Sequence, residues 1–118
     1  MRILVVDDDP LAGEMTAALL EFQGHTPVLA NDAMEAINQL DNLEDIALII
    51  SDMHMPLING VELLEMLREQ GIILPFILLT GDTSHSALKQ MPGLSACLQK
   101  DAELEHTLGQ AVKQALNG

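Results

Sequence analysis

Three consecutive aspartates, Asp7 to Asp9, directly follow the aliphatic stretch ILVV at residues 3–6. Like charges repel, and two unit charges about 4 Å apart cost about 4 kcal/mol at an effective dielectric constant near 20. Such a cluster must be offset by a cation or by raised pKa values of the carboxyl groups. An oxygen-only ligand set with few protein carboxylates favours Mg²⁺, which keeps water ligands and accepts a phosphoryl oxygen as a further ligand. The acidic triplet therefore predicts a magnesium site.

Three further polar residues stand at the ends of later apolar stretches, namely Asp52, Thr80 and Lys100. The chain has 5 Lys and Arg residues, and of these only Lys100 follows a strand-like stretch. The carboxyl ends of parallel strands meet at one edge of a sheet, so we expect these side chains to converge with Asp7 and Asp8 in one crevice. The predicted site combines three carboxylates, one hydroxyl and one ammonium group.

Five short apolar stretches are expected to form the strands. They span residues 2–6, 26–30, 46–51, 76–80 and 96–99. The stretch at 46–51 is continuously apolar, which is typical of a strand buried on both faces. Pro27 cannot donate a ladder hydrogen bond, so the strand at 26–30 is expected at an edge of the sheet.

The segments between these stretches carry helix signals. Asp9 can cap a first helix that has Pro10 at its first position and ends at Gly24. Apolar residues at helical spacing in this segment are Leu11, Met15, Ala18, Leu19 and Phe22. Later helices are expected after a cap at Asn31 or Asp32, from Val61 to a stop at Gly71, near residues 84–90, and through Leu104, Leu108, Val112 and Leu116.

Strands and helices thus alternate five times along a single domain that covers residues 1–118. This alternation predicts an α/β fold in which helices cover both faces of a parallel sheet through right-handed crossovers. For five strands we expect the flavodoxin-like, doubly wound (βα)5 arrangement with the strand order 2-1-3-4-5. Ligands are expected beyond the carboxyl ends of the strands, beside the switch point between strands 1 and 3.

Composition excludes several classes of function. The 118 residues include 5 Lys and Arg against 18 Asp and Glu, a net charge of −13, which argues against direct binding to nucleic acid or to an anionic membrane. The longest apolar run, at residues 72–79, is too short to span a bilayer. The first strand begins too early to leave room for a signal peptide, and Cys97 has no second cysteine to pair with. These features predict a cytoplasmic location.

Four motifs, in order and each at the end of an expected strand, resemble those of the receiver domain of two-component response regulators. They are VDDD at 6–9, SDMHMPLING at 51–60, LLTG at 78–81 and LQK at 98–100. The resemblance covers the whole chain and implies the receiver fold.

The resemblance also implies a chemistry. Asp52 would be the nucleophile that takes a phosphoryl group from the phosphohistidine of a sensor histidine kinase or a histidine phosphotransfer protein, forming an acyl phosphate. Asp8, Asp52 and the main-chain carbonyl of His54 would bind Mg²⁺ directly, and Asp7 would act through a metal-bound water. The domain would catalyse only its own phosphorylation and dephosphorylation, and it is therefore not expected to be an enzyme.

In the same family a lysine and a hydroxyl group contact the phosphoryl group. Here Lys100 would pair with one phosphoryl oxygen, and Thr80 would move inward to donate its hydroxyl to another, which changes a surface that binds a downstream partner. The aromatic residue usually found three positions before the lysine is Cys97 in this chain, so we expect a different coupling. Asp101 replaces the usual proline, which predicts a trans peptide after Lys100. His54 borders the path of the attacking water, where it either tunes dephosphorylation or is an ordinary exposed loop residue.

Other functions remain open at this point. A degenerate receiver that only docks partner proteins would also fit, given Cys97 and Asp101. A small Mg²⁺-dependent phosphatase of the haloacid-dehalogenase type would use Asp7 and Asp9 as its D-x-D pair, but Leu11 stands where that family has Thr or Val. A flavodoxin-like FMN binder fits poorly because carboxylates occupy the loop that would need backbone N–H groups for phosphate. The four histidines show no metal-ligand spacing with Cys97.

Overall fold

The computed structural model, which describes residues 1–81 and 93–117, contains one sheet of five parallel strands. They are β1 (Arg2–Val6), β2 (Thr26–Ala30), β3 (Ile46–Asp52), β4 (Phe76–Thr80) and β5 (Ala96–Gln99). Their order is β2-β1-β3-β4-β5, which confirms the predicted order and the edge position of the strand that carries Pro27. The predicted bounds agree with the structure except that β3 extends by one residue to include Asp52.

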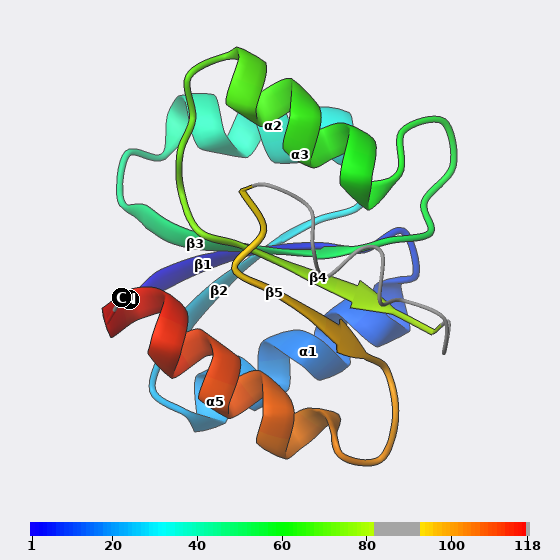
Figure 1. Ribbon diagram of the computed structural model, residues 1–118, viewed down its shortest axis with the longest axis vertical. Coiled ribbons are helices and arrows are strands. Elements are labelled where there is room, and N and C mark those ends of the chain that lie inside the picture. The colour runs from blue at the N-terminus through cyan, green and yellow to red at the C-terminus, as the bar shows by residue number, and fades with distance from the viewer. Residues whose placement is uncertain (82–92, 118) are drawn as a thin grey trace.

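Helices cover both faces of this sheet. The described part of the chain contains α1 (Pro10–Phe22), α2 (Ala33–Asn42), α3 (Gly60–Glu69) and α5 (Leu104–Asn117). Figure 1 shows α2 and α3 on one face and α1 and α5 on the other. The helix predicted near residues 84–90 lies outside the described residues. None of the described helices has the length and apolar character needed to cross a membrane.

Two apolar layers hold the helices on the sheet, because successive side chains of a strand point to opposite faces. On β1, Leu4 and Val6 belong to the layer under α2 and α3, whereas Ile3 and Val5 belong to the layer under α1 and α5. β3 supplies both layers, which explains its continuously apolar sequence. The two layers therefore fix which way each residue at a strand end points.

Side-chain caps set where the helices begin. Asp9 accepts a hydrogen bond from the N–H of Leu11 at 3.1 Å, with Pro10 at the first helical position as predicted. Asp32, rather than Asn31, caps α2 by accepting from the N–H of Glu35 at 2.8 Å. These caps satisfy helix N–H groups that have no intrahelical partner.

The orientation of α1 differs from the apolar pattern that predicts the helix. Leu11, Met15 and Phe22 are 67%, 64% and 85% exposed, and the side of the helix that faces the sheet is formed by smaller residues around Leu20. The reason is close approach: a Cβ added at Gly13 would lie 3.5 Å from the Cβ of Asp7 and 3.4 Å from Leu29. Only small side chains fit there, so the larger apolar residues form an exposed stripe along the helix. We call Leu11, Met15 and Phe22 the α1 stripe.

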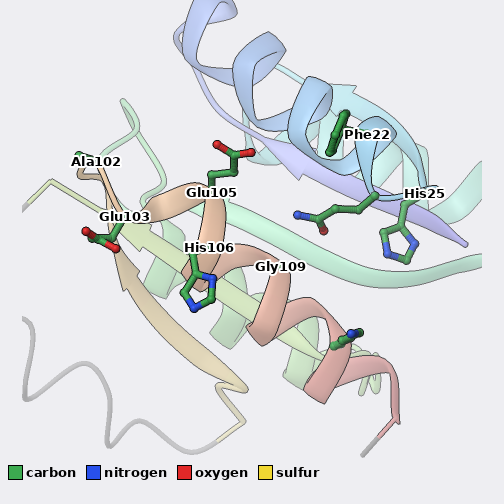
Figure 2. A pocket seen from close by; sticks show the side chains of 9 residues that line it. Phe22, His25, Ala102, Glu103, Glu105, His106 and Gly109 are labelled. Carbon is green, nitrogen blue, oxygen red and sulfur yellow. The ribbon is translucent and has the colours of Figure 1, made fainter.

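A groove lies between the end of α1 and α5. Figure 2 shows Phe22 and His25 on one side of it and Glu105, His106 and Gly109 on the other. Gly109 leaves room for the side chain of Gln23, whose Nε2 would lie 3.0 Å from a Cβ at that position. None of the polar residues at the ends of β1, β3 and β4 lines this groove. The groove and the strand-end residues are therefore separate features of the molecule.

The orientation of α1 predicts which substitutions destabilise the fold. Replacing Met15 or Phe22 by Gln should change the free energy of unfolding by less than about 0.5 kcal/mol, because both side chains are exposed. Leu20→Ala should cost about 2–5 kcal/mol, because it leaves a cavity between α1 and the sheet. Urea unfolding followed by circular dichroism measures both. A loss for Phe22→Gln as large as that for Leu20→Ala would contradict the observed orientation.

Candidate functional site

Two buried carboxylates and one exposed carboxylate meet at the carboxyl ends of β1 and β3. Asp7 and Asp52 are 4% and 8% exposed, whereas Asp8 lies in solvent. Oxygen atoms of the three carboxylates all lie within 4.8 Å of one another. The backbone explains this convergence: the N–H of Asp7 continues the sheet by donating to the carbonyl of Ala30 at 3.0 Å, and Asp52 is the last residue of β3.

Lys100 bridges the two buried carboxylates. Its Nζ lies 3.2 Å from Oδ2 of Asp7 and 3.1 Å from Oδ1 of Asp52. The residue follows β5, and its backbone N–H donates to the carbonyl of Thr80 at 2.8 Å, which holds the side chain at this end of the sheet. The structure thus brings together residues that lie 93 positions apart in the sequence, as the strand-end pattern predicts.

Burial and charge act on the pKa values of this cluster in opposite directions. Burial raises the pKa of Asp52 above its ordinary value of 3.8; the hydrogen bond and charge of Lys100 oppose this shift, and the neighbouring Asp7 adds to it. A backbone hydrogen bond from His54 also favours the charged form of Asp52. For Lys100, burial alone would lower the pKa, but Asp52 and Asp7 outweigh it and raise the pKa above 10.5. The ammonium therefore stays charged, and it offsets only part of the negative charge.

The donor set suits a hard divalent cation. Every side-chain ligand is a carboxylate oxygen, and the three carboxylates outnumber the one ammonium group. Asp7 is already engaged through both oxygens, because Oδ1 accepts from the N–H of Asp9 at 3.0 Å and Oδ2 accepts from Lys100. This fits action of Asp7 through a metal-bound water, and the exposed Asp8 is the best placed for direct contact with Mg²⁺. Direct contact by Asp52 stays a prediction. The predicted role of the His54 carbonyl stays a prediction.

The two predicted switch residues, Thr80 and Cys97, are both buried. Thr80 is fully buried at the end of β4 and, by the alternation of the strand, points to the same side as Leu78. Cys97 is opposite Leu78 in the strand register and belongs to the apolar layer under α2 and α3. A small buried side chain thus stands where the resemblance to receiver domains implies an aromatic residue. The peptide after Lys100 is trans, since the described residues contain no cis bond.

The loop from β3 to α3 packs tightly on the end of β3. The N–H of Gly60 donates to the carbonyl of Met53 at 3.0 Å, and a Cβ at Gly60 would lie 2.6 Å from the carbonyl oxygen of Asp52. Glycine is therefore required by this contact. Leu57 has a φ of 69° and is fully exposed, at a turn in which the N–H of Ile58 donates to the carbonyl of Pro56 at 2.8 Å. Backbone of this kind is costly for leucine, and nothing in the sequence pattern indicates it.

Comparisons with known proteins agree with this geometry. The family model described as the response regulator receiver domain matches residues 3–113. Response regulator MprA of Mycobacterium avium (strain 104) is 38% identical over 96 residues, which cover 81% of this chain and 41% of that protein. Sensor histidine kinase RcsC of Escherichia coli (strain K12) is 32% identical over 118 residues, which cover 98% of this chain and 12% of that protein. The chain thus spans about two fifths or less of these curated relatives.

A solved structure gives the same result at the level of the fold. The response regulator TrrA from Thermotoga maritima, in complex with Mg²⁺–BeF, superimposes with a TM-score of 0.86 at 28% sequence identity. The match covers 98% of this chain and 98% of that chain. The similarity therefore extends from β1 to α5.

The crowding of carboxylates predicts how Mg²⁺ and Asp52 affect stability. Because the pKa of Asp52 is raised, its ionisation costs stability as the pH rises from 3.8 through the folded-state pKa. Asp52→Asn should therefore be more stable than the wild type in metal-free buffer at neutral pH, by roughly 1 kcal/mol or about 4 °C in melting temperature. Mg²⁺ should stabilise the wild type but not the variant.

Thermal unfolding with and without Mg²⁺ measures both effects, with Asp41→Asn as the control because Asp41 is an exposed carboxylate on α2. A lower stability of Asp52→Asn without metal, or an equal gain from Mg²⁺ in both proteins, would rule out this account of the cluster.

Proposed function

Because the chain belongs to the response regulator receiver domains, we propose that Asp52 accepts a phosphoryl group from a phosphohistidine. The donor would be a sensor histidine kinase or a histidine phosphotransfer protein, and the reaction would take place in the cytoplasm. The observation that supports this most is the buried Asp52 carboxylate, which lies 3.1 Å from the Lys100 ammonium and beside the carboxylates of Asp7 and Asp8. An oxygen of Asp52 attacks phosphorus, the P–O bond forms as the P–N bond breaks, and the electron pair of that bond leaves with the imidazole.

The residues around Asp52 would have separate roles in binding the phosphoryl group and the metal. Lys100 presents positive charge to the incoming phosphoryl oxygens, and Asp7 holds Lys100 in place through its Oδ2 atom. Asp8, Asp52 and the main-chain carbonyl of His54 would hold Mg²⁺, with Asp7 acting through a water molecule. When bound, the metal offsets the negative charge of the carboxylates and the phosphoryl group together.

The switch would involve Thr80 and Cys97. Thr80 would turn its hydroxyl toward a phosphoryl oxygen, and Cys97 shares the layer that this movement disturbs. A downstream protein or effector domain reads the change. His54 is exposed two residues after the acceptor and would tune the loss of the phosphoryl group to water. The domain would catalyse only these reactions on itself.

The α1 stripe is a suitable contact for the phosphoryl donor. The helix is apolar toward the sheet and apolar toward solvent, which is typical of a helix covered on both sides. The stripe begins at Leu11, close in sequence to the acidic residues of the site, and continues to Phe22. A donor that brings its phosphohistidine to Asp52 would pack an apolar helix face here, and the net charge of −13 would attract a basic rim around that face.

The geometry favours this function over the phosphatase alternative. Asp9 does not take part in the carboxylate cluster, because its side chain caps α1 through the N–H of Leu11. The D-x-D pair that a haloacid-dehalogenase-type phosphatase needs is therefore not formed. A receiver that only docks partners keeps Cys97 and Asp101 as its support, and phosphoryl uptake distinguishes it from the proposal.

Asp52→Asn should abolish phosphoryl uptake without unfolding the domain. The change removes the nucleophile and conserves the shape of the side chain. Mass spectrometry after incubation with acetyl phosphate and Mg²⁺ measures uptake, with Asp41→Asn as the control. Uptake by Asp52→Asn would disprove the assignment, and no uptake by the wild type would favour the docking-only receiver.

Met15→Gln should separate donor contact from chemistry. Transfer from a phosphorylated donor protein should fall roughly tenfold in kcat/KM, the effect of losing an apolar contact worth somewhat more than 1 kcal/mol. The rate with acetyl phosphate should be unchanged, because Met15 is exposed on α1 and is not one of the clustered carboxylates. Met34→Gln on α2 is the matched control, since Met34 is also an exposed methionine. Equal rates from the donor in all three proteins would exclude the α1 stripe as the contact.

A further inference from the structure

Arg68, near the end of α3, donates hydrogen bonds from its guanidinium group to three backbone carbonyls in the described part of the chain. Nη1 donates to the carbonyl of Ile72 at 2.6 Å, and Nη2 donates to the carbonyls of Leu74 and Gly93, both at 2.8 Å. The chain has 18 acidic residues, yet in its described part Arg68 forms no ion pair. The side chain is half-buried, and burial lowers the pKa of the guanidinium group from its ordinary value. Such a set of bonds points to a positional role.

Gly93 is shaped to receive this guanidinium. Its φ is +84°, a conformation that glycine adopts without strain, and a Cβ at this position would lie 2.9 Å from Nε of Arg68. Two residues later, the N–H of Ser95 donates to the carbonyl of Phe76 at 2.8 Å, and β5 begins at Ala96. Arg68 therefore holds the chain where it enters β5.

The same guanidinium also holds the entry to β4. Ile72 and Leu74 belong to the connection between α3 and β4, so one side chain ties the starts of both strands to the end of α3. β4 ends at Thr80, and β5 contains Cys97 and is followed by Lys100. Arg68 thus holds the starts of β4 and β5 together, at the end of the sheet opposite to Asp52. These are the two strands that would carry the response to phosphorylation.

The other end of α3 lies at the acceptor. Gly60 begins the helix and packs on the carbonyl oxygen of Asp52. A helix of ten residues is about 15 Å long, so α3 connects the acceptor loop to the guanidinium contacts over this distance. A structural change at Asp52 that moves the start of α3 is therefore opposed by the backbone contacts of Arg68 near the end of the helix.

We infer that Arg68 is a positioning residue that keeps the entry of β5 fixed when Asp52 is phosphorylated. This inference rests on the proposed function. A planar guanidinium fork can reach three carbonyls at once, whereas the ammonium group of a lysine acts as a single point charge. The planar geometry of the guanidinium group, and not its charge alone, therefore holds the carbonyl of Gly93.

Hydrogen exchange tests this role at the backbone N–H groups of Gly93 to Ser95, measured with and without acetyl phosphate and Mg²⁺. In the wild type, exchange at these positions should not change on phosphorylation. In Arg68→Lys and Arg68→Gln it should become at least about fivefold faster on phosphorylation, the lower end of typical coupling between two sites. Arg2→Gln is the matched control, because the Arg2 side chain forms an ion pair with the exposed Asp45.

The outcomes are distinguishable. An Arg68→Lys protein that behaves like the wild type would overturn the role of the fork. Faster exchange in the variants that is the same with and without phosphate would mean that Arg68 contributes stability alone, which also overturns the inference. Phosphoryl uptake is measured by mass in the same samples. Absence of uptake in the wild type would overturn the proposed function itself, whereas uptake with unchanged exchange overturns only the role of Arg68.

Discussion

The bridge from Lys100 to Asp7 and Asp52 is the interaction on which the site depends. Parallel strands that end in carboxylates bring like charges together in a partly buried place, and the sheet can keep them there only beside a cation. Lys100, which supplies the ammonium group, follows β5 and is the last of the site residues in the sequence. Correct assembly of β1, β3, β4 and β5 is therefore needed before the acidic residues are compensated. The fold and the site are coupled through this one requirement.

The scaffold around the bridge brings polar residues of several strands to one edge of the sheet. Asp7, Asp52 and Lys100 meet there through their side chains, while Thr80 is buried at the end of β4 and Cys97 belongs to the apolar layer under α2 and α3. Gly60 supports this arrangement at β3, because α3 can begin directly on the carbonyl oxygen of Asp52 only if no side chain intervenes.

Much of this could be predicted from the sequence, for identifiable reasons. The strands are continuous aliphatic runs with clear ends, so their bounds and order were predicted closely, and the positions of Asp52, Thr80 and Lys100 followed from them. The orientation of α1 was not predictable from spacing, because the helix is apolar on two sides and the choice depends on how closely Gly13 approaches Asp7. The three carbonyl contacts of Arg68 were missed as well, since backbone acceptors leave no trace in a sequence.

The edge of the sheet formed by β2 has a consequence for self-association. The N–H of Thr26 points inward to the carbonyl of Met1, so by the alternation of the strand Pro27 faces outward, where its missing N–H removes one donor from the exposed edge. An open edge strand is a template on which a foreign strand can add and start an aggregate. In β2 that template is short and interrupted at its second residue. The proline thus serves as a gatekeeper against sheet extension, at an edge remote from Lys100.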